Sequence, residues 1–310
     1  MMPPGDGRSL LDPSLRDAVG RLPDVHLSPE LLAQVRAAPP PLRQPLPGVE
    51  SSDHPVPDST VVLRVYRPTG VAGPLPGLYW MHGGGYVLGN TDTDDARFAR
   101  LCPELGCIGF SVEYRLAPET PYPGPLEDCY DGLRWVHDNA ESLGVDLTRL
   151  GVGGSSAGGG LAAALGLLTR ERAQLPIAFQ LLECPMIDDR QATDSSRLNG
   201  LAVWSRESNT FGWRSYLGDL HNTGNIPATA AAARATDLTK LPPAYVCVGG
   251  ADGFRDEDVD YAMRLSQAGV PTDLRVYAGL PHGLAALGPS RALTQWQTDA
   301  DAWLGRQFAK

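Results

Sequence analysis

Apolar residues occur in short continuous runs that alternate with longer segments of helical spacing. The runs are typical of buried strands, and they lie at residues 78–81, 107–112, 149–152, 179–182, 244–248 and 274–277. Helical spacing predicts helices at residues 92–105, 126–143, 161–168, 257–268 and 292–308. An alternating pattern at Val61, Leu63 and Val65 predicts one more strand, near the edge of the sheet. Strands separated by helices predict the α/β class, with a mostly parallel sheet and helices on both faces.

Two stretches do not follow this alternation. Residues 1–55 are rich in proline, and the segment 38–48 (APPPLRQPLPG) must be extended or turning. We expect residues 1–55 to form an N-terminal cap segment that lies over the main domain, residues 56–310. Residues 188–225 carry four aromatic side chains without the alternation of strand and helix, and we expect them to form an inserted lid.

The composition excludes several kinds of partner. The chain has 310 residues and a formal net charge of −10, with a pI of about 5.0. This acidic balance, without a basic run, argues against nucleic acid or an anionic membrane surface as the main partner. No apolar stretch reaches about 18 residues, so no membrane span is expected, and the first residues lack the pattern of a secretion signal.

The cysteines and histidines do not suggest a metal centre. The five cysteines are scattered along the chain, which predicts reduced, buried thiols in a cytoplasmic protein. Neither Cys-x-x-Cys nor His-Glu-x-x-His occurs, so no metal site is expected.

The most informative stretch is residues 151–160, GVGGSSAGGG. The pattern Gly-x-Ser-x-Gly fits it in one register only, with Ser156 between Gly154 and Gly158. A serine in this pattern, between a strand and a helix, lies on a tight turn that projects its hydroxyl above the sheet. The run lacks the lysine of a phosphate-binding loop, and Ser156 stands where a dinucleotide-binding loop has its third glycine. We therefore expect a nucleophilic serine and no nucleotide cofactor.

A serine hydroxyl needs a base that takes its proton and a carboxylate that orients the base. His282 is the one histidine of six that both follows the last predicted strand and comes after the serine in the order expected. Ligands of open α/β sheets bind beyond the carboxyl ends of the strands, so His282 is the expected base. Asp252, just past the strand at 244–248, is the expected acid. The competing carboxylates are Asp256, Asp188 and Asp189.

Acyl transfer also needs donors for the negative oxygen of the tetrahedral intermediate. A predicted strand ends at His82, Gly83, Gly84 and Gly85, and glycines have no Cβ to block approach to their N–H groups. We expect the N–H groups of Gly83 and Gly84 to form an oxyanion hole with that of Ala157, the residue after the nucleophile. His82 and Gly85 support this loop, and His82 is expected to hold it by hydrogen bonding without exchanging the catalytic proton.

Taken together, the motifs resemble the hormone-sensitive-lipase-like branch of the α/β-hydrolases, the bacterial family IV esterases. The matching segments are 82–86 (HGGGY), 114–119 (YRLAPE), 122–128 (YPGPLED), 154–159 (GSSAGG), 252–257 (DGFRDE) and 282–284 (HGL). Ser155 replaces the more usual Asp or Thr before the nucleophile, and Gly253 replaces the proline of the family's acid motif. Neither departure removes a reactive group.

This resemblance implies an α/β-hydrolase fold whose cap is formed by the N-terminal segment and the insertion. It implies a serine carboxylesterase that hydrolyses short to medium acyl esters through an acyl-enzyme, with a small-molecule ester as its partner and no cofactor. A homodimer is also implied as possible. Because the triad serves acyl transfer in general, amide, carbamate or lactone hydrolysis is an alternative. A non-catalytic small-molecule-binding protein on the same scaffold is the alternative of another class, which the presence of all three triad residues disfavours.

Overall fold

A single sheet forms the centre of the molecule. The computed structural model describes residues 5–22, 26–39, 43–283, 287–288 and 290–310. Within these residues, the strands follow the order β1-β2-β4-β3-β5-β6-β7-β8. Their bounds are β1 (Val49–Pro55), β2 (Val62–Pro68), β3 (Leu75–Met81), β4 (Ile108–Glu113), β5 (Val145–Ser155), β6 (Gln180–Glu183), β7 (Ala244–Gly249) and β8 (Thr272–Tyr277). The pairs β1–β2 and β2–β4 are antiparallel, whereas all other neighbours are parallel, which confirms the mostly parallel sheet.

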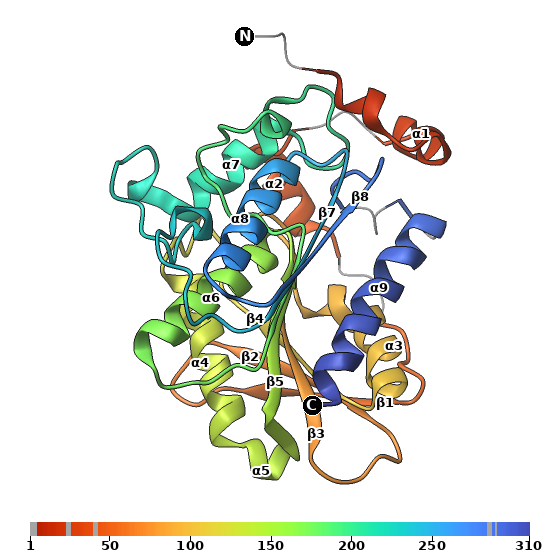
Figure 1. The fold of residues 1–310 in the computed structure, drawn as a ribbon, viewed down its shortest axis with the longest axis vertical. Helices are drawn as coiled ribbons and strands as arrows, with labels where there is room; N and C mark the ends of the chain where they lie inside the picture. Colours follow the sequence, from red (N-terminus) through yellow and green to blue (C-terminus); the bar gives the residue numbers. More distant parts are fainter. Residues whose placement is uncertain (1–4, 23–25, 40–42, 284–286, 289) are drawn as a thin grey trace.

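Helices cover both faces of this sheet, as predicted (Figure 1). The α-helices are α1 (Arg16–Gly20), α2 (Pro29–Ala37), α3 (Asp95–Leu105), α4 (Gly124–Asp138), α5 (Ala140–Leu143), α6 (Ala157–Arg172), α7 (Arg206–Leu217), α8 (Arg255–Gln267) and α9 (Arg291–Phe308). Short 3-10 helices lie at Gly7–Leu10, Pro13–Leu15, Thr91–Asp94, Ser195–Arg197, Gly218–Leu220 and Ala232–Arg234. Helices α3 and α9 pack on one face, and α4, α6 and α8 pack on the other.

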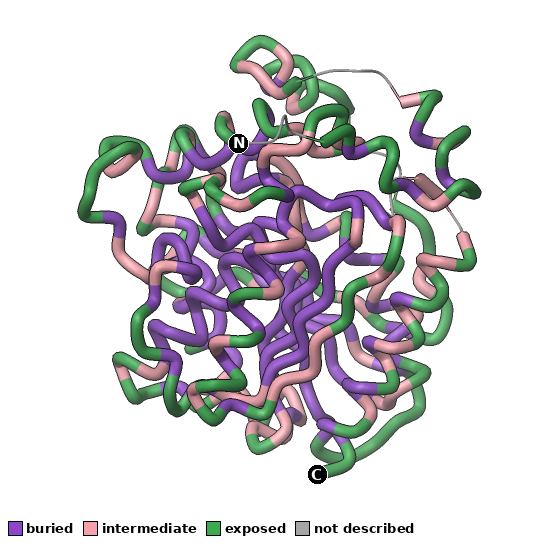
Figure 2. The backbone as a smooth tube through the Cα atoms, turned by 45° about the horizontal axis from the view of Figure 1, so that its top comes forward, coloured by how far each residue is buried: buried purple, intermediate pink, exposed green. Residues whose placement is uncertain are grey.

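The burial of both faces explains why the strands could be found in the sequence. Successive side chains of a strand point to opposite faces, and in β3 Leu78 and Trp80 pack with α3 and α9 while Tyr79 and Met81 pack on the other side. All four are buried, and the central strands form the buried interior in Figure 2. A strand that is covered on both faces has a continuous run of apolar residues in its sequence. Such a run at residues 78–81 predicted β3.

The edge of the sheet differs from the prediction. Residues 49–55, expected to be the end of the cap segment, form β1 and pair with β2 from Val49 opposite Pro68 to Pro55 opposite Val62. Most of β1 is exposed or half-buried, so its sequence VESSDHP has no apolar pattern, and the strand arises from its pairing with β2. The strand predicted near the edge is therefore β2, second in the sheet, and residues 49–55 belong to the sheet.

The segments predicted as cap and lid contact each other. The 3-10 helices before α1, and α1, α2 and α7 gather at one end of the molecule, opposite α5 (Figure 1). The Gly7 N–H donates to Asn199 O at 2.8 Å, and the Leu27 N–H donates to Ser208 Oγ at 2.9 Å. Two parts of the chain that are about 180 residues apart thus lie side by side.

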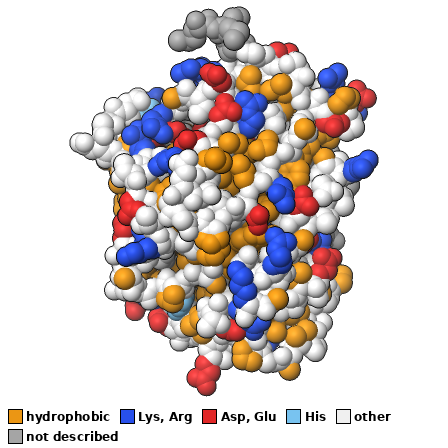
Figure 3. Space-filling view, in the orientation of Figure 1, with side chains coloured by type: hydrophobic (Ala, Val, Ile, Leu, Met, Phe, Trp, Pro, Cys, Tyr) orange, Lys and Arg blue, Asp and Glu red, His pale blue; other side chains and the backbone are white. Residues whose placement is uncertain are grey.

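The surface carries charges of both signs among hydrophobic side chains on the face shown in Figure 3. Among the described residues, no helix combines the length and the apolar character that a membrane span requires. All five cysteines are buried and free, as the sequence predicts.

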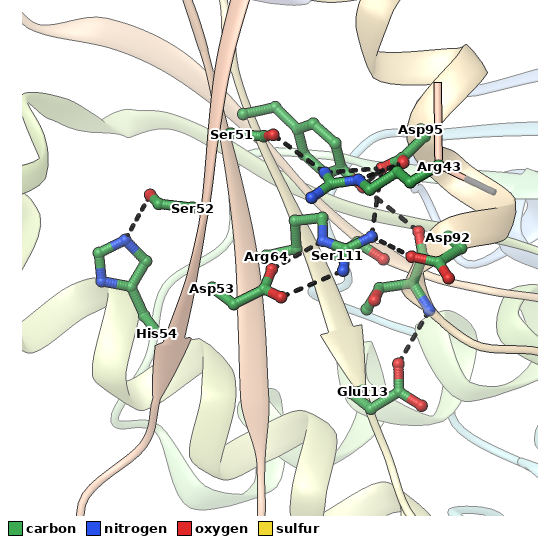
Figure 4. A network of polar contacts seen from close by, with 12 residues as sticks. Arg43, Ser51, Ser52, Asp53, His54, Arg64, Asp92, Asp95, Ser111 and Glu113 are labelled. Atoms are coloured by element: carbon green, nitrogen blue, oxygen red, sulfur yellow. Dashed lines mark hydrogen bonds and ion pairs between the residues drawn. The ribbon is translucent and has the colours of Figure 1, made fainter. Parts of the chain in front are cut away.

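A network of charged side chains joins β1 and β2 to the start of α3 (Figure 4). The guanidinium of buried Arg64 donates to Asp53 at 2.7 Å, to Asp92 at 2.5 Å and to Asp95 at 3.3 Å. Arg43 donates to Asp95 at 2.7 Å as well. The hydrogen bond to Asp53 is the largest influence that raises the pKa of Arg64 above its ordinary value. The buried guanidinium of Arg64 thus binds carboxylates from β1, from the 3-10 helix Thr91–Asp94 and from α3.

Replacing this cation tests its contribution to stability. We expect Arg64→Met to lower the free energy of unfolding by about 3 kcal/mol, because removing one partner of a buried ion pair leaves the other charges uncompensated. Urea denaturation at neutral pH measures this loss. The matched control is Arg275→Met, at an exposed position of β8, which should change stability by less than about 0.5 kcal/mol. Equal losses in the two variants would contradict the role assigned to Arg64.

Candidate active site

Ser156 lies on a sharp turn between β5 and α6. Its backbone angles, φ 57° and ψ −121°, fall in a region that residues other than glycine rarely adopt. Hydrogen bonds hold this conformation: the Ser156 N–H donates to Glu183 O at 2.8 Å, and Ser156 O accepts from the N–H groups of Gly160 and Met186 at 3.0 and 2.8 Å. This is the strand, turn and helix that the Gly-x-Ser-x-Gly pattern predicts.

The two glycines of the pattern are required by close packing. A Cβ added to Gly154 would collide with the backbone of Gly158, and one added to Gly158 would collide with the carbonyl oxygens of Met81 and His82. Only glycine at both positions lets β3, β5 and α6 approach this closely. The turn therefore holds Ser156 against the loop that follows β3.

The structure brings together the three residues that the sequence analysis nominated. Ser156 Oγ lies 2.8 Å from His282 Nε2, and His282 Nδ1 lies 2.7 Å from Asp252 Oδ2. The second carboxylate oxygen, Asp252 Oδ1, accepts from the Phe254 N–H at 2.9 Å. All three side chains are buried. Leu284, the last residue of the HGL motif, lies outside the described residues.

The competing carboxylates are engaged elsewhere. Asp256 accepts from the Ser195 N–H at 2.7 Å and from Arg255 at 2.8 Å. Asp188 pairs with Arg190, and Asp189 pairs with Arg234. Among the acids considered, Asp252 is thus the one that contacts His282.

Opposing effects determine the pKa of His282. Burial is the largest single influence and lowers the pKa, because it disfavours the charged imidazolium. The negative charge of Asp252, the neighbouring Cys184 and the hydrogen bonds together outweigh burial, so the pKa of His282 lies well above its ordinary value. The edge of the Phe254 ring packs against the imidazole, with 4.7 Å between ring centroids, and helps to hold its orientation.

The glycine loop after β3 runs along the serine turn. A Cβ added to Gly83 would lie 3.0 Å from Ser155 O and 3.4 Å from Ser156 Cβ. Gly84 has φ 125° and Gly85 has φ 60°, conformations that favour glycine. Within the described chain, the N–H groups of Gly83, Gly84 and Ala157 donate to no protein acceptor. Their expected role as oxyanion donors stays a prediction.

His82 has the position of a supporting residue. Its Nδ1–H donates to Gly83 O at 2.8 Å, and its ring stacks on Tyr114 with 4.2 Å between centroids. Burial lowers the pKa of His82 to about 4, so the ring is neutral at neutral pH. Tyr114 OH also donates to His82 O at 2.8 Å. These contacts fit the prediction that His82 holds the loop.

The residues that cover the glycine loop were not identified from the sequence. The indole of Trp204 packs on Gly85 so closely that a Cβ there would collide with the ring, and Val203 packs on Gly283 in the same way. The sequence of the expected lid is rich in aromatic residues, but it does not indicate what those side chains contact.

Cys184 is a second residue that sequence reasoning missed. It follows β6 directly, and its Sγ, a carboxylate oxygen of Asp252 and an imidazole nitrogen of His282 all lie within 4.8 Å of one another. Its place just beyond the carboxyl end of a strand is the signal that could have indicated it.

The sheet, the serine turn and the Ser–His–Asp contacts define an α/β-hydrolase. A family model described as the alpha/beta hydrolase fold matches residues 78–286. The chain belongs to this family, in the hormone-sensitive-lipase-like branch of ester hydrolases, so the predicted family and fold are confirmed.

Several of its relatives are named as esterases. Esterase LipI of Mycobacterium tuberculosis is 38% identical over 217 residues, which cover 67% of this chain and 65% of LipI, just under two thirds of that protein. Carboxylesterase NlhH of the same organism is 36% identical over 226 residues, covering 72% of this chain and 70% of NlhH. A solved structure described as a bacterial heroin esterase superposes with a TM-score of 0.89 at 37% identity, covering 97% of this chain and 98% of the other.

The pKa of His282 gives a test of the site. For ester hydrolysis, kcat/KM should rise with pH to a midpoint above 6.5, the ordinary histidine value, because the base must lose its proton before it can accept another. In Asp252→Asn the negative charge that raises this pKa is gone. The midpoint should therefore move to lower pH, and the maximal rate should fall by about 10⁴-fold.

The matched control is Asp256→Asn, whose carboxylate contacts Ser195 and Arg255 instead of the imidazole. It should keep the parental pH profile. If the pH midpoint of kcat/KM moved in Asp256→Asn but not in Asp252→Asn, Asp256 would be the acid that acts on His282.

Proposed function

We propose that this protein is a serine carboxylesterase that hydrolyses short to medium acyl esters through an acyl-enzyme. The observation that carries the proposal is the continuous hydrogen-bonded chain from Asp252 through His282 to Ser156. A serine, its base and an orienting carboxylate in this arrangement are the groups that acyl transfer requires. The family supports the same chemistry, since relatives at 36–38% identity are named esterases.

In the first step, Ser156 Oγ attacks the ester carbonyl carbon as His282 Nε2 takes the hydroxyl proton. The carbonyl oxygen becomes an oxyanion, which the N–H groups of Gly83, Gly84 and Ala157 stabilise; one such donor is worth roughly 3 to 4 kcal/mol of barrier. Asp252 keeps the imidazole proton on Nδ1 and stabilises the imidazolium. When the tetrahedral intermediate collapses, His282 donates its Nε2 proton to the leaving alcohol.

The second step returns the enzyme to its starting state. A water molecule loses a proton to His282 Nε2 and attacks the acyl carbon. Collapse of the second intermediate releases the carboxylic acid, and Ser156 Oγ regains its proton. No cofactor or metal takes part in these steps.

We also propose that the N-terminal segment up to residue 48 and the insertion 188–225 cap the acyl pocket. The contacts between the two segments support this, and so does the packing of Trp204 on the glycine loop. The buried, free cysteines fit a cytoplasmic location. A homodimer is a further part of the proposal, and light scattering tests it.

Amide, carbamate or lactone hydrolysis is the second candidate, because the same groups serve any acyl donor. A panel of acyl donors at one concentration separates the candidates. Turnover of an amide faster than any ester would favour the second candidate. A non-catalytic binding protein is disfavoured by the intact hydrogen-bonded chain.

The nucleophile is tested by Ser156→Ala. We expect hydrolysis of p-nitrophenyl butyrate to fall by about 10⁶-fold, because the remaining groups cannot form the acyl-enzyme. Circular dichroism verifies that the variant is folded. The control is Ser155→Ala, which removes the neighbouring hydroxyl and should retain most of the activity. Full activity in Ser156→Ala would end the proposal, and a fluorophosphonate probe should label the parent but not this variant.

The proposed cap is tested by Trp204→Ala. Removing the indole that packs on Gly85 opens space over the glycine loop, so we expect the ratio of kcat/KM for p-nitrophenyl octanoate to that for the butyrate to rise about tenfold. Phe211→Ala, in α7 of the same insertion, is the matched control and should leave the ratio near its parental value. An equal rise of this ratio in both variants would show that the insertion affects acyl preference through its overall stability and not through the Trp204 indole.

A further inference from the structure

We propose that Cys184, Asp252 and His282 form an inhibitory site for a soft divalent cation such as Zn²⁺. The inference rests on the proposed function in one respect, since inhibition presupposes that His282 is the catalytic base. The three side chains supply a sulfur, a carboxylate oxygen and an imidazole nitrogen, and these atoms all lie within 4.8 Å of one another. This combination of ligands is typical of zinc.

The required movement is small. Tetrahedral Zn²⁺ with bonds of about 2.0 to 2.3 Å places its ligand atoms roughly 3.3 to 3.8 Å apart. The three ligand atoms, which lie within 4.8 Å of one another, therefore need to shift by about 1 Å to reach these separations. Three protein ligands leave a fourth position for water, as in many zinc sites with an open coordination position.

A cavity gives the ion access to the thiol. It has a volume of about 120 Å³, and Cys184, Pro281 and Gly283 line it beside the triad. Arg97 lines the same cavity, but its guanidinium donates two hydrogen bonds to Glu183, at 3.0 and 2.6 Å. Among the described residues that line the cavity, Arg97 is the one cation, and its charge is thus already neutralised.

Binding changes the tautomer of the base. His282 Nε2 faces Ser156 and Nδ1 faces Asp252, so we assign Nδ1 as the ligand. A neutral imidazole with a metal on Nδ1 carries its proton on Nε2, where it donates to Ser156 and cannot accept the serine proton. The thiol releases one proton to solvent as the sulfur–metal bond forms. The ion thereby removes the base without closing the substrate pocket.

Inhibition of ester hydrolysis is the first measurement. Zn²⁺ and Cd²⁺ should lower kcat with little change in KM, and EDTA should restore the rate, whereas Mg²⁺ and Ca²⁺, which prefer oxygen ligands, should have no effect. In Cys184→Ser, the inhibition constant for Zn²⁺, relative to the variant's own metal-free rate, should rise at least about tenfold. Cys129→Ser, which replaces another buried cysteine, in α4, should keep the parental constant.

A second measurement does not depend on activity. Cd²⁺ bound to a thiolate absorbs in the ultraviolet, and titration should give this band with one ion per chain in the parent and in Cys129→Ser but not in Cys184→Ser. Equal bands or equal inhibition constants in both cysteine variants would overturn the proposal. A parent that binds Cd²⁺ through Cys184 but hydrolyses no ester without metal would leave the site standing and reject the esterase instead.

Discussion

The backbone conformation of Ser156 is the constraint on which the rest of the structure depends. A positive φ at a residue other than glycine is unfavourable by about 1 to 3 kcal/mol, and neighbouring elements must maintain it. Ser156 forms hydrogen bonds with Glu183, the last residue of β6, and with Met186, which follows this strand. The close glycine contacts between β5, α6 and the end of β3 hold the turn from the other side. The sheet therefore determines where the hydroxyl points.

The same turn is also supported by an ion pair between half-buried Arg97 and buried Glu183. Glu183, whose carbonyl accepts from Ser156, also receives two hydrogen bonds from Arg97 of α3. The guanidinium lies over the Trp80 ring of β3 at 3.9 Å from the centroid. Side chains of α3, β3 and β6 thus support the turn that holds Ser156 at the carboxyl end of β5, in the middle of the sheet.

Two parts of the molecule contribute residues to the site. The sheet side supplies the serine, the glycine loop and a buried acid that raises the pKa of His282. Residues 188–225 supply Trp204 and Val203, which pack on Gly85 and Gly283 of the two neighbouring loops. The hydrogen-bonded chain of Ser156, His282 and Asp252 thus comes from the ends of sheet strands, and the side chains that cover the neighbouring loops come from residues 188–225.

The sequence by itself determined the α/β class, the central strands and the positions of Ser156, Asp252 and His282. It could do so because buried strands are apolar runs and because the carboxyl ends of parallel strands converge on one edge. Only the tertiary structure decided that residues 49–55 pair as β1, that Trp204 covers Gly85, and that Cys184 lies beside the triad. Each of these depends on contacts between residues far apart in the chain, where the local sequence carries no periodic signal and the packing of neighbouring elements alone sets the outcome.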